Sequence, residues 1–170
     1  AMQVVGDKYE TGEYFIPDLV MAAEAMKAAM AVFEPELKAR QEERQALGTV
    51  VIGTVEGDIH EIGKTLVATM LGAAGFQVHD LGVDVPVSRF VEQVRETGAD
   101  VVGLSALLTT TMRKQEAVIE ALQEAGLRER VKVIIGGAPA SAEWAQTIGA
   151  DAYAESASEA VGVVKRLLGT

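Results

Sequence analysis

One aspartate and one histidine, separated by a single residue, have the spacing that in this sequence best suits metal binding. Asp58 and His60 are followed by Gly63, and all three come directly after an apolar, β-branched run over residues 49–55. At this spacing a carboxylate can accept the Nδ1 proton of the imidazole, which fixes the tautomer and leaves Nε2 free for a metal. Gly63 would let a flat group or a backbone segment approach closely. The same residues could also form an ordered loop in which His60 only hydrogen-bonds to Asp58.

Composition indicates an acidic, packed globular chain. The 170 residues are 49% hydrophobic with four prolines, which is typical of one folded domain with at most a short appendage. The net charge of −10 disfavours nucleic acid as a partner, because no basic patch offsets the phosphate charge. The sequence has no cysteine, which excludes disulfides, thiolate metal ligands and a thiol nucleophile. We expect no membrane span and no signal peptide, and we expect a cytoplasmic protein.

Alternating strand and helix patterns from residue 49 onward must position these side chains. Five strands with intervening helices predict an α/β fold with a parallel sheet covered on both faces. We expect a flavodoxin-like (Rossmann-like) five-stranded sheet of order 2-1-3-4-5, with its switch point beside the first strand and therefore beside Asp58 and His60. The strands are predicted at residues 50–55, 77–81, 101–104, 131–135 and 152–154, and the helices at 63–74, 88–97, 112–125, 142–148 and 158–168.

A helical segment precedes the predicted sheet. Apolar side chains recur at helical spacing over residues 15–33, and Pro35 predicts the start of a second helix. Residues 6–13 are polar and aromatic and predict a turn or the tail of a helix. The chain is therefore expected to divide into a helical cap, residues 1–48, and an α/β domain, residues 49–170.

Two further loops are expected at the same edge of the sheet as Asp58, because parallel strands end there together. The loop after the fourth strand contains Gly136 and Gly137. A glycine pair can simply serve a tight turn, and Ser and Thr are common helix N-caps. A flavodoxin-like sheet would nevertheless bring all three loops to one crevice. The loop after the third strand groups four hydroxyl side chains, Ser105, Thr109, Thr110 and Thr111.

In this order and on these loops, the motifs resemble the cobalamin-binding domain of the corrinoid-dependent methyltransferases, a methionine-synthase-like family. The family pattern is Asp-x-His-x-x-Gly, then Ser-x-Leu, then Gly-Gly. The resemblance covers residues 49–170 and implies a cobalamin or related corrinoid with its cobalt, while the segment from Gly12 to Met30 resembles the helical cap of the family. Glu61 departs from the aspartate that is frequent at its position. The matching residues are Asp58, His60, Gly63, Ser105, Leu107, Gly136 and Gly137.

The resemblance implies a role for each of these residues. His60 would be the lower axial ligand of cobalt in place of the dimethylbenzimidazole base, with Asp58 hydrogen-bonded to its other nitrogen. When the bond to cobalt is lost His60 could gain a proton that Asp58 stabilises, and Thr111 stands where a hydroxyl extends this relay in some members. Contacts with the corrinoid and its displaced nucleotide tail are expected at Gly57, Ile59, Glu61, Ile62, Gly63, Gly72, Ser105, Leu107, Thr109, Gly136, Gly137 and Ala138, with Phe15 and Leu19 over the upper face of the corrin ring.

The resemblance implies a methyl-carrying corrinoid protein, a carrier subunit rather than a complete enzyme. Its partners would be a substrate-specific methyltransferase and a second, acceptor methyltransferase, with a reductive activase as a further candidate. Two alternatives are the B12-binding subunit of an adenosylcobalamin-dependent mutase and a B12-dependent sensor or flavodoxin-like module without cobalamin. The Phe-Ile-Pro-Asp-Leu helix of residues 15–19 disfavours the mutase, and no DNA-binding segment that would support a sensor is visible in the sequence.

The resemblance also implies a cap of four helices. The 48 residues ahead of the predicted first strand are therefore expected to form an incomplete cap. Such a cap would either self-associate through its apolar face or leave the upper face of the corrin open to water.

Overall fold

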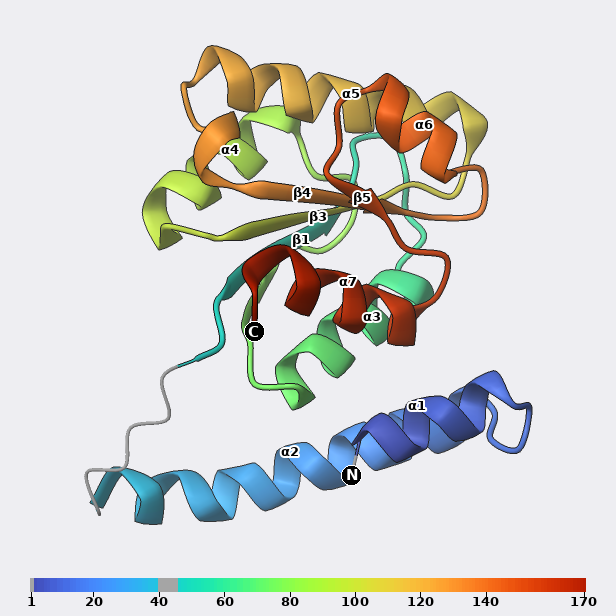
Figure 1. The fold of residues 1–170 in the computed structure, drawn as a ribbon, viewed down its shortest axis with the longest axis vertical. Helices are drawn as coiled ribbons and strands as arrows, with labels where there is room; N and C mark the ends of the chain where they lie inside the picture. Colours follow the sequence, from blue (N-terminus) through green and yellow to red (C-terminus); the bar gives the residue numbers. More distant parts are fainter. Residues whose placement is uncertain (1, 40–45) are drawn as a thin grey trace.

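The computed structural model describes residues 2–39 and 46–170 and contains a five-stranded parallel sheet between two layers of helices (Figure 1). The strand order β2-β1-β3-β4-β5, with all four neighbouring pairs parallel, confirms the predicted flavodoxin-like topology. The strands are β1 (Thr49–Thr54), β2 (Gln77–Asp80), β3 (Val101–Ser105), β4 (Lys132–Gly136) and β5 (Ala152–Tyr153). The helices around them are α3 (Ile62–Ala73), α4 (Val87–Thr97), α5 (Thr109–Glu124), the short 3₁₀ helix η1 (Arg128–Arg130), α6 (Ala142–Thr147) and α7 (Ala157–Leu168).

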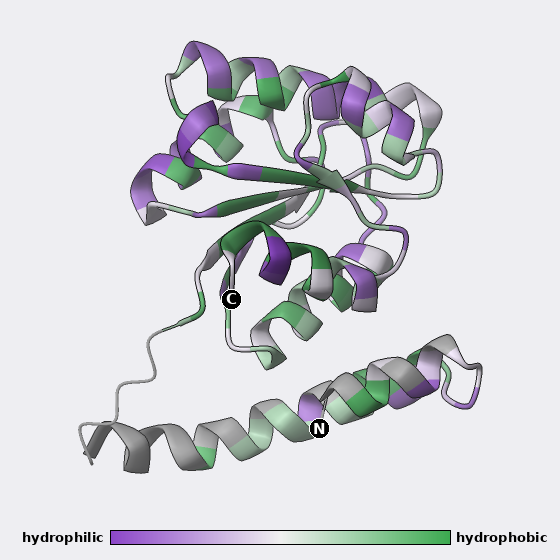
Figure 2. Cartoon of the chain, in the orientation of Figure 1, coloured by the Kyte–Doolittle hydropathy of each residue, from purple (hydrophilic) through white to green (hydrophobic). Residues whose placement is uncertain are grey.

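The two faces of the sheet form two separate hydrophobic clusters. Val50 of β1 and Val101 of β3 pack with side chains of α3 and α7. Val51 and Val102, the next residues along each strand, pack with side chains of α4, α5 and α6 on the opposite face. Because both faces are covered, these strands are continuous apolar runs rather than alternating ones. Figure 2 shows this hydrophobic sheet between α4, α5 and α6, which carry many hydrophilic residues, and α3 and α7, which are largely hydrophobic.

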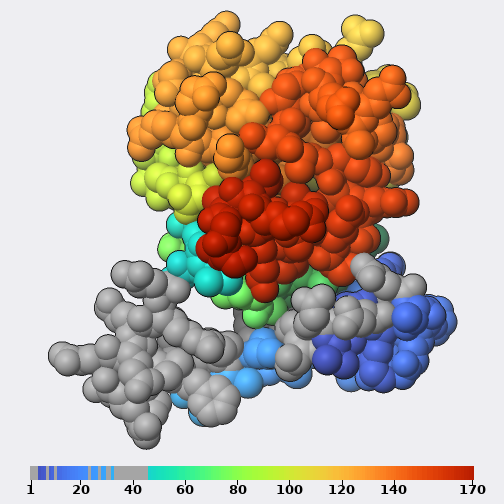
Figure 3. Space-filling view, in the orientation of Figure 1, coloured from blue at the N-terminus to red at the C-terminus, as the bar shows by residue number. Residues whose placement is uncertain are grey.

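Two helices, α1 (Met2–Glu10) and α2 (Ile16–Ala39), form an antiparallel pair, the cap, beside α3 and α7 (Figures 1 and 3). Gly6 of α1 lies so close to the α/β domain that an added Cβ would be 3.3 Å from the side chain of Met70 and 3.5 Å from that of Ser158. Leu19 of α2 is buried in the same cluster as Met70. The turn between α1 and α2 lies at the end of the molecule where the strands have their carboxyl ends (Figure 1).

The cap differs in one respect from the sequence prediction. Helix α2 continues to Ala39, so the prediction that a second helix begins at Pro35 is wrong. A proline inside a helix removes one backbone hydrogen bond and costs about 3 kcal/mol, which does not by itself end a helix. The helical pair is formed instead by α2 and α1, whose end at Glu10 and following turn agree with the predicted helix tail. The rest of the predicted second helix reaches residues 40–45, which lie outside the described residues.

Within residues 2–39 and 46–170, none of the helices combines the length and the apolar character needed to cross a membrane.

Candidate functional site

Asp58 is fully buried in the loop after β1, and both of its carboxylate oxygens are engaged. Oδ1 accepts a hydrogen bond from the backbone N–H of His60 at 3.1 Å and lies 2.7 Å from His60 Nδ1. Oδ2 accepts from the backbone N–H of Leu107 and from the hydroxyl of Thr111, each at 2.7 Å. Burial acts to raise the pKa of Asp58, but the hydrogen bonds from Thr111, Leu107 and His60 outweigh it and hold that pKa well below its ordinary value. The carboxylate is therefore ionised at neutral pH.

The start of α5 explains part of this environment. The helix begins at Thr109, three residues earlier than predicted, and its N-cap residue Leu108 provides no side-chain cap. The backbone N–H of Leu108 donates to Asp58 Oδ2 at 3.3 Å, beside the N–H of Leu107. The N-terminus of a helix carries free N–H groups and a partial positive charge, which favour an anion. The carboxylate of Asp58, from the loop after β1, thus lies at the N-terminus of α5 and accepts the two backbone N–H groups that lead into the helix.

The contact with Asp58 fixes the orientation of His60. An ionised carboxylate only accepts hydrogen bonds, so Nδ1 carries the proton and Nε2 keeps its lone pair. The imidazole is 47% exposed, and the backbone carbonyl of His60 accepts a hydrogen bond at 2.8 Å from the buried hydroxyl of Thr54. The structure thus presents one imidazole nitrogen to solvent on a firmly held loop, which is the arrangement of an aimed metal ligand.

Exposed apolar side chains lie on both sides of His60. Ile59 and Ile62 are 74% and 72% exposed, and Leu107 and Leu108 are 41% and 43% exposed. These residues come from the loop after β1, the start of α3 and the loop after β3, all at the carboxyl edge of the sheet. Clustered exposed apolar side chains commonly mark a binding surface. Ile59, Ile62 and Leu107 line the same cavity as His60, so the apolar side chains and the imidazole together suit a ligand that is flat, apolar and metal-bearing.

A cavity of about 760 Å³ lies beside His60, between the sheet and helices α3 and α7. Its volume is in the range of small-molecule sites. The predicted residues that line it are Ile59, His60, Glu61, Ile62, Gly63, Ser105, Leu107, Gly136, Gly137 and Ala138. The lining also includes residues for which the sequence predicted no role, among them Tyr9 of the cap, Tyr153 of β5 and Lys64 of α3. Lys64 is buried and forms an ion pair with Asp80 at the end of β2.

Glycines keep the walls of this cavity free of side chains. A Cβ added to Gly63 would meet nothing within 4 Å, so the space above this residue is open to a ligand. Gly137 has a φ of +118°, and a Cβ there would lie 1.8 Å from the carbonyl oxygen of Ala106. No other residue fits such a position. The close approach brings the loops after β3 and β4 into contact and forms a wall of backbone.

Gln115 of α5 joins the ends of β3 and β4, which lead into these two loops, from the opposite face of the sheet. Its Nε2 donates to the carbonyl of Leu104 at 3.0 Å and to that of Gly136 at 3.1 Å, and its Oε1 accepts from Nε1 of Trp144 at 3.1 Å. Every polar atom of this fully buried side chain is therefore satisfied. Gln115 was not among the predicted site residues. The available signal was a polar residue at the first position of an apolar i, i+3, i+4, i+7 pattern with Val118, Ile119 and Leu122.

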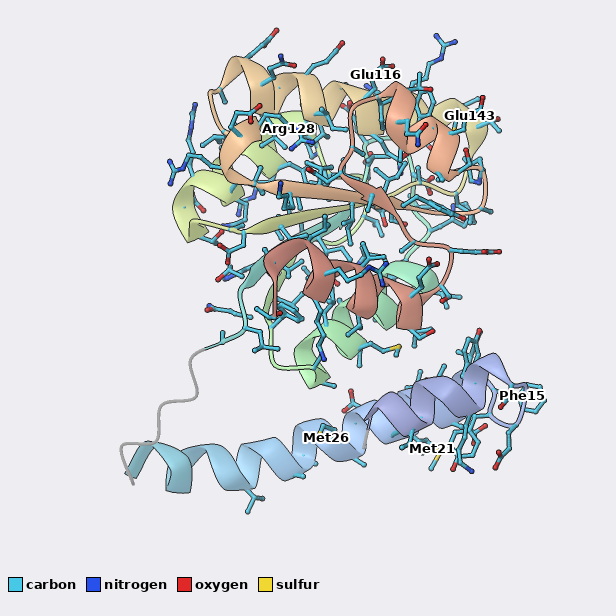
Figure 4. The ribbon with its side chains drawn as sticks, viewed as in Figure 1. Phe15, Met21, Met26, Glu116, Arg128 and Glu143 are labelled. Atoms are coloured by element: carbon cyan, nitrogen blue, oxygen red, sulfur yellow. The ribbon has the colours of Figure 1, made fainter. Side chains whose placement is uncertain are left out.

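Several predicted residues lie outside the cavity. Gly72 is exposed near the C-terminal end of α3, and Thr109 is exposed at the start of α5. Leu19 is buried against α3, which gives it a packing role, whereas Phe15 is 68% exposed and projects outward at the turn between α1 and α2 (Figure 4). Gly57, Asp58 and Thr111 do not line the cavity. Contact with a cofactor stays a prediction for all of these residues, Phe15, Leu19, Gly57, Gly72 and Thr109.

In the described part of the chain, no three side chains of His, Cys, Asp or Glu lie together as a metal site. A lone imidazole suits a metal whose other ligands belong to a macrocycle. The residues present fit such a group. His60 would provide a metal ligand, the apolar side chains near it would contact the macrocycle, and the open space at Gly63 would leave room for the rest of the molecule.

Comparisons with known proteins agree with this fit. A family model described as a B12 binding domain matches residues 48–162, and a second model with the same description matches residues 1–34. Dimethylamine corrinoid protein 2 of Methanosarcina acetivorans is 56% identical over 167 residues, which cover 98% of this chain and 77% of that protein. The crystal structure of a cobalamin-binding protein from Desulfitobacterium hafniense matches with a TM-score of 0.84 at 42% identity, covering 98% of this chain and 77% of that one. The methanol:cobalamin methyltransferase complex of Methanosarcina barkeri contains a chain that matches with a TM-score of 0.83 at 30% identity, covering 99% and 63%.

Proposed function

The chain belongs to the B12-binding domain family, and from this membership we propose that it is a corrinoid protein that carries a methyl group between two methyltransferases. The observation that carries the proposal is a half-exposed imidazole, oriented by a buried carboxylate, at the mouth of a glycine-lined cavity. When bound, the corrinoid supplies a cobalt atom that accepts and releases the methyl group. The chain binds the corrinoid, orients it and controls one proton.

We propose that His60 Nε2 would bind the cobalt of the corrinoid and that the cavity between the sheet and helices α3 and α7 would hold the nucleotide tail. The exposed side chains of Ile59, Ile62 and Leu107 would contact the corrin ring. The backbone wall at Gly136 and Gly137 would lie along the tail, with the open space at Gly63 on the opposite side.

Asp58 and Thr111 control the proton at His60. Nε2 can hold a metal or a proton but not both, and when it holds a proton the imidazole is cationic. The ionised Asp58, 2.7 Å from Nδ1, stabilises that cation by a charge-assisted hydrogen bond. Uptake of a proton at Nε2 would therefore free His60 from a bound metal, and the hydrogen bond from Thr111 would set how much negative charge Asp58 directs at the imidazole.

The names of the relatives suggest the partners. Relatives more than half identical to this chain are dimethylamine and trimethylamine corrinoid proteins, so we propose a methylamine as the methyl source. A separate substrate-specific methyltransferase would load the chain, as the methanol:cobalamin methyltransferase complex illustrates for a more distant relative. A second methyltransferase would unload it and a reductive activase would restore it, in the cytoplasm.

Ligation by His60 can be tested with cobinamide, a corrinoid that lacks the nucleotide base. In the Co(II) electron paramagnetic resonance spectrum of bound cobinamide, hyperfine splitting from a nitrogen other than those of the corrin ring can then come only from the protein. We expect this coupling in the wild type, and we expect His60→Ala to abolish it while retaining some cobalamin through the tail cavity.

The matched control is His79→Ala, because His79 on β2 is the second of the two histidines in the chain. It should keep the coupling. An unchanged spectrum in His60→Ala, or its loss in His79→Ala, would contradict the assignment.

A further inference from the structure

A second acidic residue, Asp84, holds the turn that carries Asp58. The backbone N–H of Asp84 donates to the carbonyl of Asp58 at 2.9 Å. Its Oδ1 accepts from the backbone N–H of Gly57 at 2.7 Å. Asp84 therefore binds both ends of the Gly57-Asp58 dipeptide, and this dipeptide sets the direction in which the Asp58 side chain points toward His60.

The backbone of Asp84 is strained. Its φ of +52° is the only positive value among the non-glycine residues that the structure describes. The left-handed conformation costs most L-residues about 1–2 kcal/mol, and Asn and Asp tolerate it best. Strain of this kind persists where the surroundings require it and is concentrated at functional sites. Its occurrence at a residue that contacts Asp58 points to the site rather than to the turn alone.

The loop that carries Asp84 does not need the Asp84 carboxylate to stay in place. The backbone N–H of Thr54 donates to the carbonyl of Gly82, and the N–H of Val85 donates to the carbonyl of Thr54, each at 3.0 Å. Val55 and Val85 form a parallel bridge. These contacts extend the β1–β2 pairing past the end of β2. What the carboxylate adds is the contact with Gly57, so its removal should leave the fold intact.

Asp58 is thus held from both neighbours of β1. The loop after β3 binds its carboxylate through Leu107 and Thr111, and the loop after β2 binds its backbone through Asp84. Two attachments on opposite sides fix the direction of the side chain, and with it the direction of His60 Nε2. Either attachment alone would leave the peptide or the carboxylate free to turn.

We infer that Asp84 is a positioning residue that sets the geometry in which His60 ligates the corrinoid. The inference rests on the proposed function, in which His60 is the ligand. Asp84 itself would touch neither the metal nor the methyl group.

Three substitutions separate the two contributions of Asp84. Asp84→Asn keeps tolerance of a positive φ and an amide oxygen that can accept from Gly57. Asp84→Gly keeps the backbone conformation but removes the acceptor, and Asp84→Ala removes both. The matched control is Asp100→Gly, because the Asp100 carboxylate accepts a backbone N–H from Thr49 at 2.8 Å at the opposite edge of the sheet.

Each variant would be loaded with cobinamide, and the fraction with nitrogen coupling in the Co(II) spectrum would be measured across pH. We expect Asp84→Gly to shift the equilibrium between ligated and free His60 about tenfold toward the free form, the lower end of the usual effect of outer-shell changes. Asp84→Ala should shift this equilibrium further. Asp84→Asn and Asp100→Gly should leave it as in the wild type. Thermal unfolding of the cofactor-free variants should be similar for Asp84→Gly and Asp100→Gly.

Wild-type ligation in Asp84→Gly and Asp84→Ala would overturn the inference. So would an equal loss of ligation in Asp100→Gly, which would show a general effect of stability. A wild type without nitrogen coupling would instead overturn the proposed function, and Asp84 would then be tested in the cofactor-free protein. There, Asp84→Gly should speed amide exchange at Gly57 and change the tautomer balance of His60 in nitrogen-15 spectra, and unchanged values would overturn the inference.

Discussion

Thr111 has one hydroxyl proton and two acceptors within reach. Its Oγ1 lies 2.7 Å from Asp58 Oδ2 and 3.0 Å from the carbonyl of Leu108. The shorter contact is to an ionised carboxylate, and such charge-assisted hydrogen bonds are the stronger ones, so the proton lies toward Asp58. Thr111 therefore draws negative charge on Asp58 away from His60 and helps to hold the pKa of Asp58 low.

Substitution Thr111→Val should make His60 easier to protonate. Without the hydroxyl, the pKa of Asp58 rises toward its ordinary value, and the carboxylate becomes a stronger acceptor for the imidazolium. The pH at which half of His60 has left cobalt should rise by up to about one unit, equivalent to about 1.4 kcal/mol. A pH titration of the Co(II) spectrum measures this, with Thr111→Ser retaining the hydroxyl for comparison. A midpoint that falls or stays constant would contradict the role of Thr111.

At the scale of elements, local signals predicted far more than distant ones. The β-branched runs and the Asp58-x-His60 spacing can be read over a few residues, and the topology rules then place three loops at one edge. Gln115 could not be assigned in this way, because its partners Leu104, Gly136 and Trp144 meet only after folding. The prediction at Pro35 was wrong although its signal was local. A proline is typical of a helix start, but here it lies inside α2, which continues to Ala39.

The hydrogen bonds of Gln115 predict a selective effect on the tail cavity. Gln115→Leu removes the hydrogen-bond partner of the Trp144 indole N–H and one hydrogen bond to each of the carbonyls of Leu104 and Gly136, which should lower the free energy of unfolding by about 1–3 kcal/mol. Because the loops after β3 and β4 line the cavity, affinity for cobalamin should fall more than affinity for cobinamide. Parallel titrations of both corrinoids measure the difference, with exposed Gln123→Leu on the same helix as the control. Equal losses for the two corrinoids would refute a role in the cavity.

At the scale of the whole molecule, the cap and the α/β domain share both a core and a cavity. Leu19 of α2 is 1% exposed and packs with Met70 and Leu71 of α3. Tyr9 of α1 lines the cavity together with side chains of α3 and α7. Loss of packing between the cap and α3 should therefore reach the binding site.

Substitution Leu19→Ala should both destabilise the protein and weaken corrinoid binding. Removal of a buried leucine side chain costs about 2–5 kcal/mol, depending on how well the cavity that it leaves can collapse. The neighbouring Val20, which is 50% exposed, provides the control Val20→Ala with a much smaller expected effect. Chemical denaturation and corrinoid titration measure the two quantities. Unchanged corrinoid affinity in a destabilised Leu19→Ala would show that the cap does not support the site.

The cavity has one wall that can be redesigned and one that cannot. At Gly137 any side chain would collide with the carbonyl oxygen of Ala106. Gln115 also joins the ends of β3 and β4 from the opposite face of the sheet. On the α3 side, a Cβ at Gly63 would meet open space. An engineer who wants this scaffold to discriminate between ligands with larger and smaller tails should therefore vary Gly63 and its neighbours on α3, and should treat Gly137 as fixed.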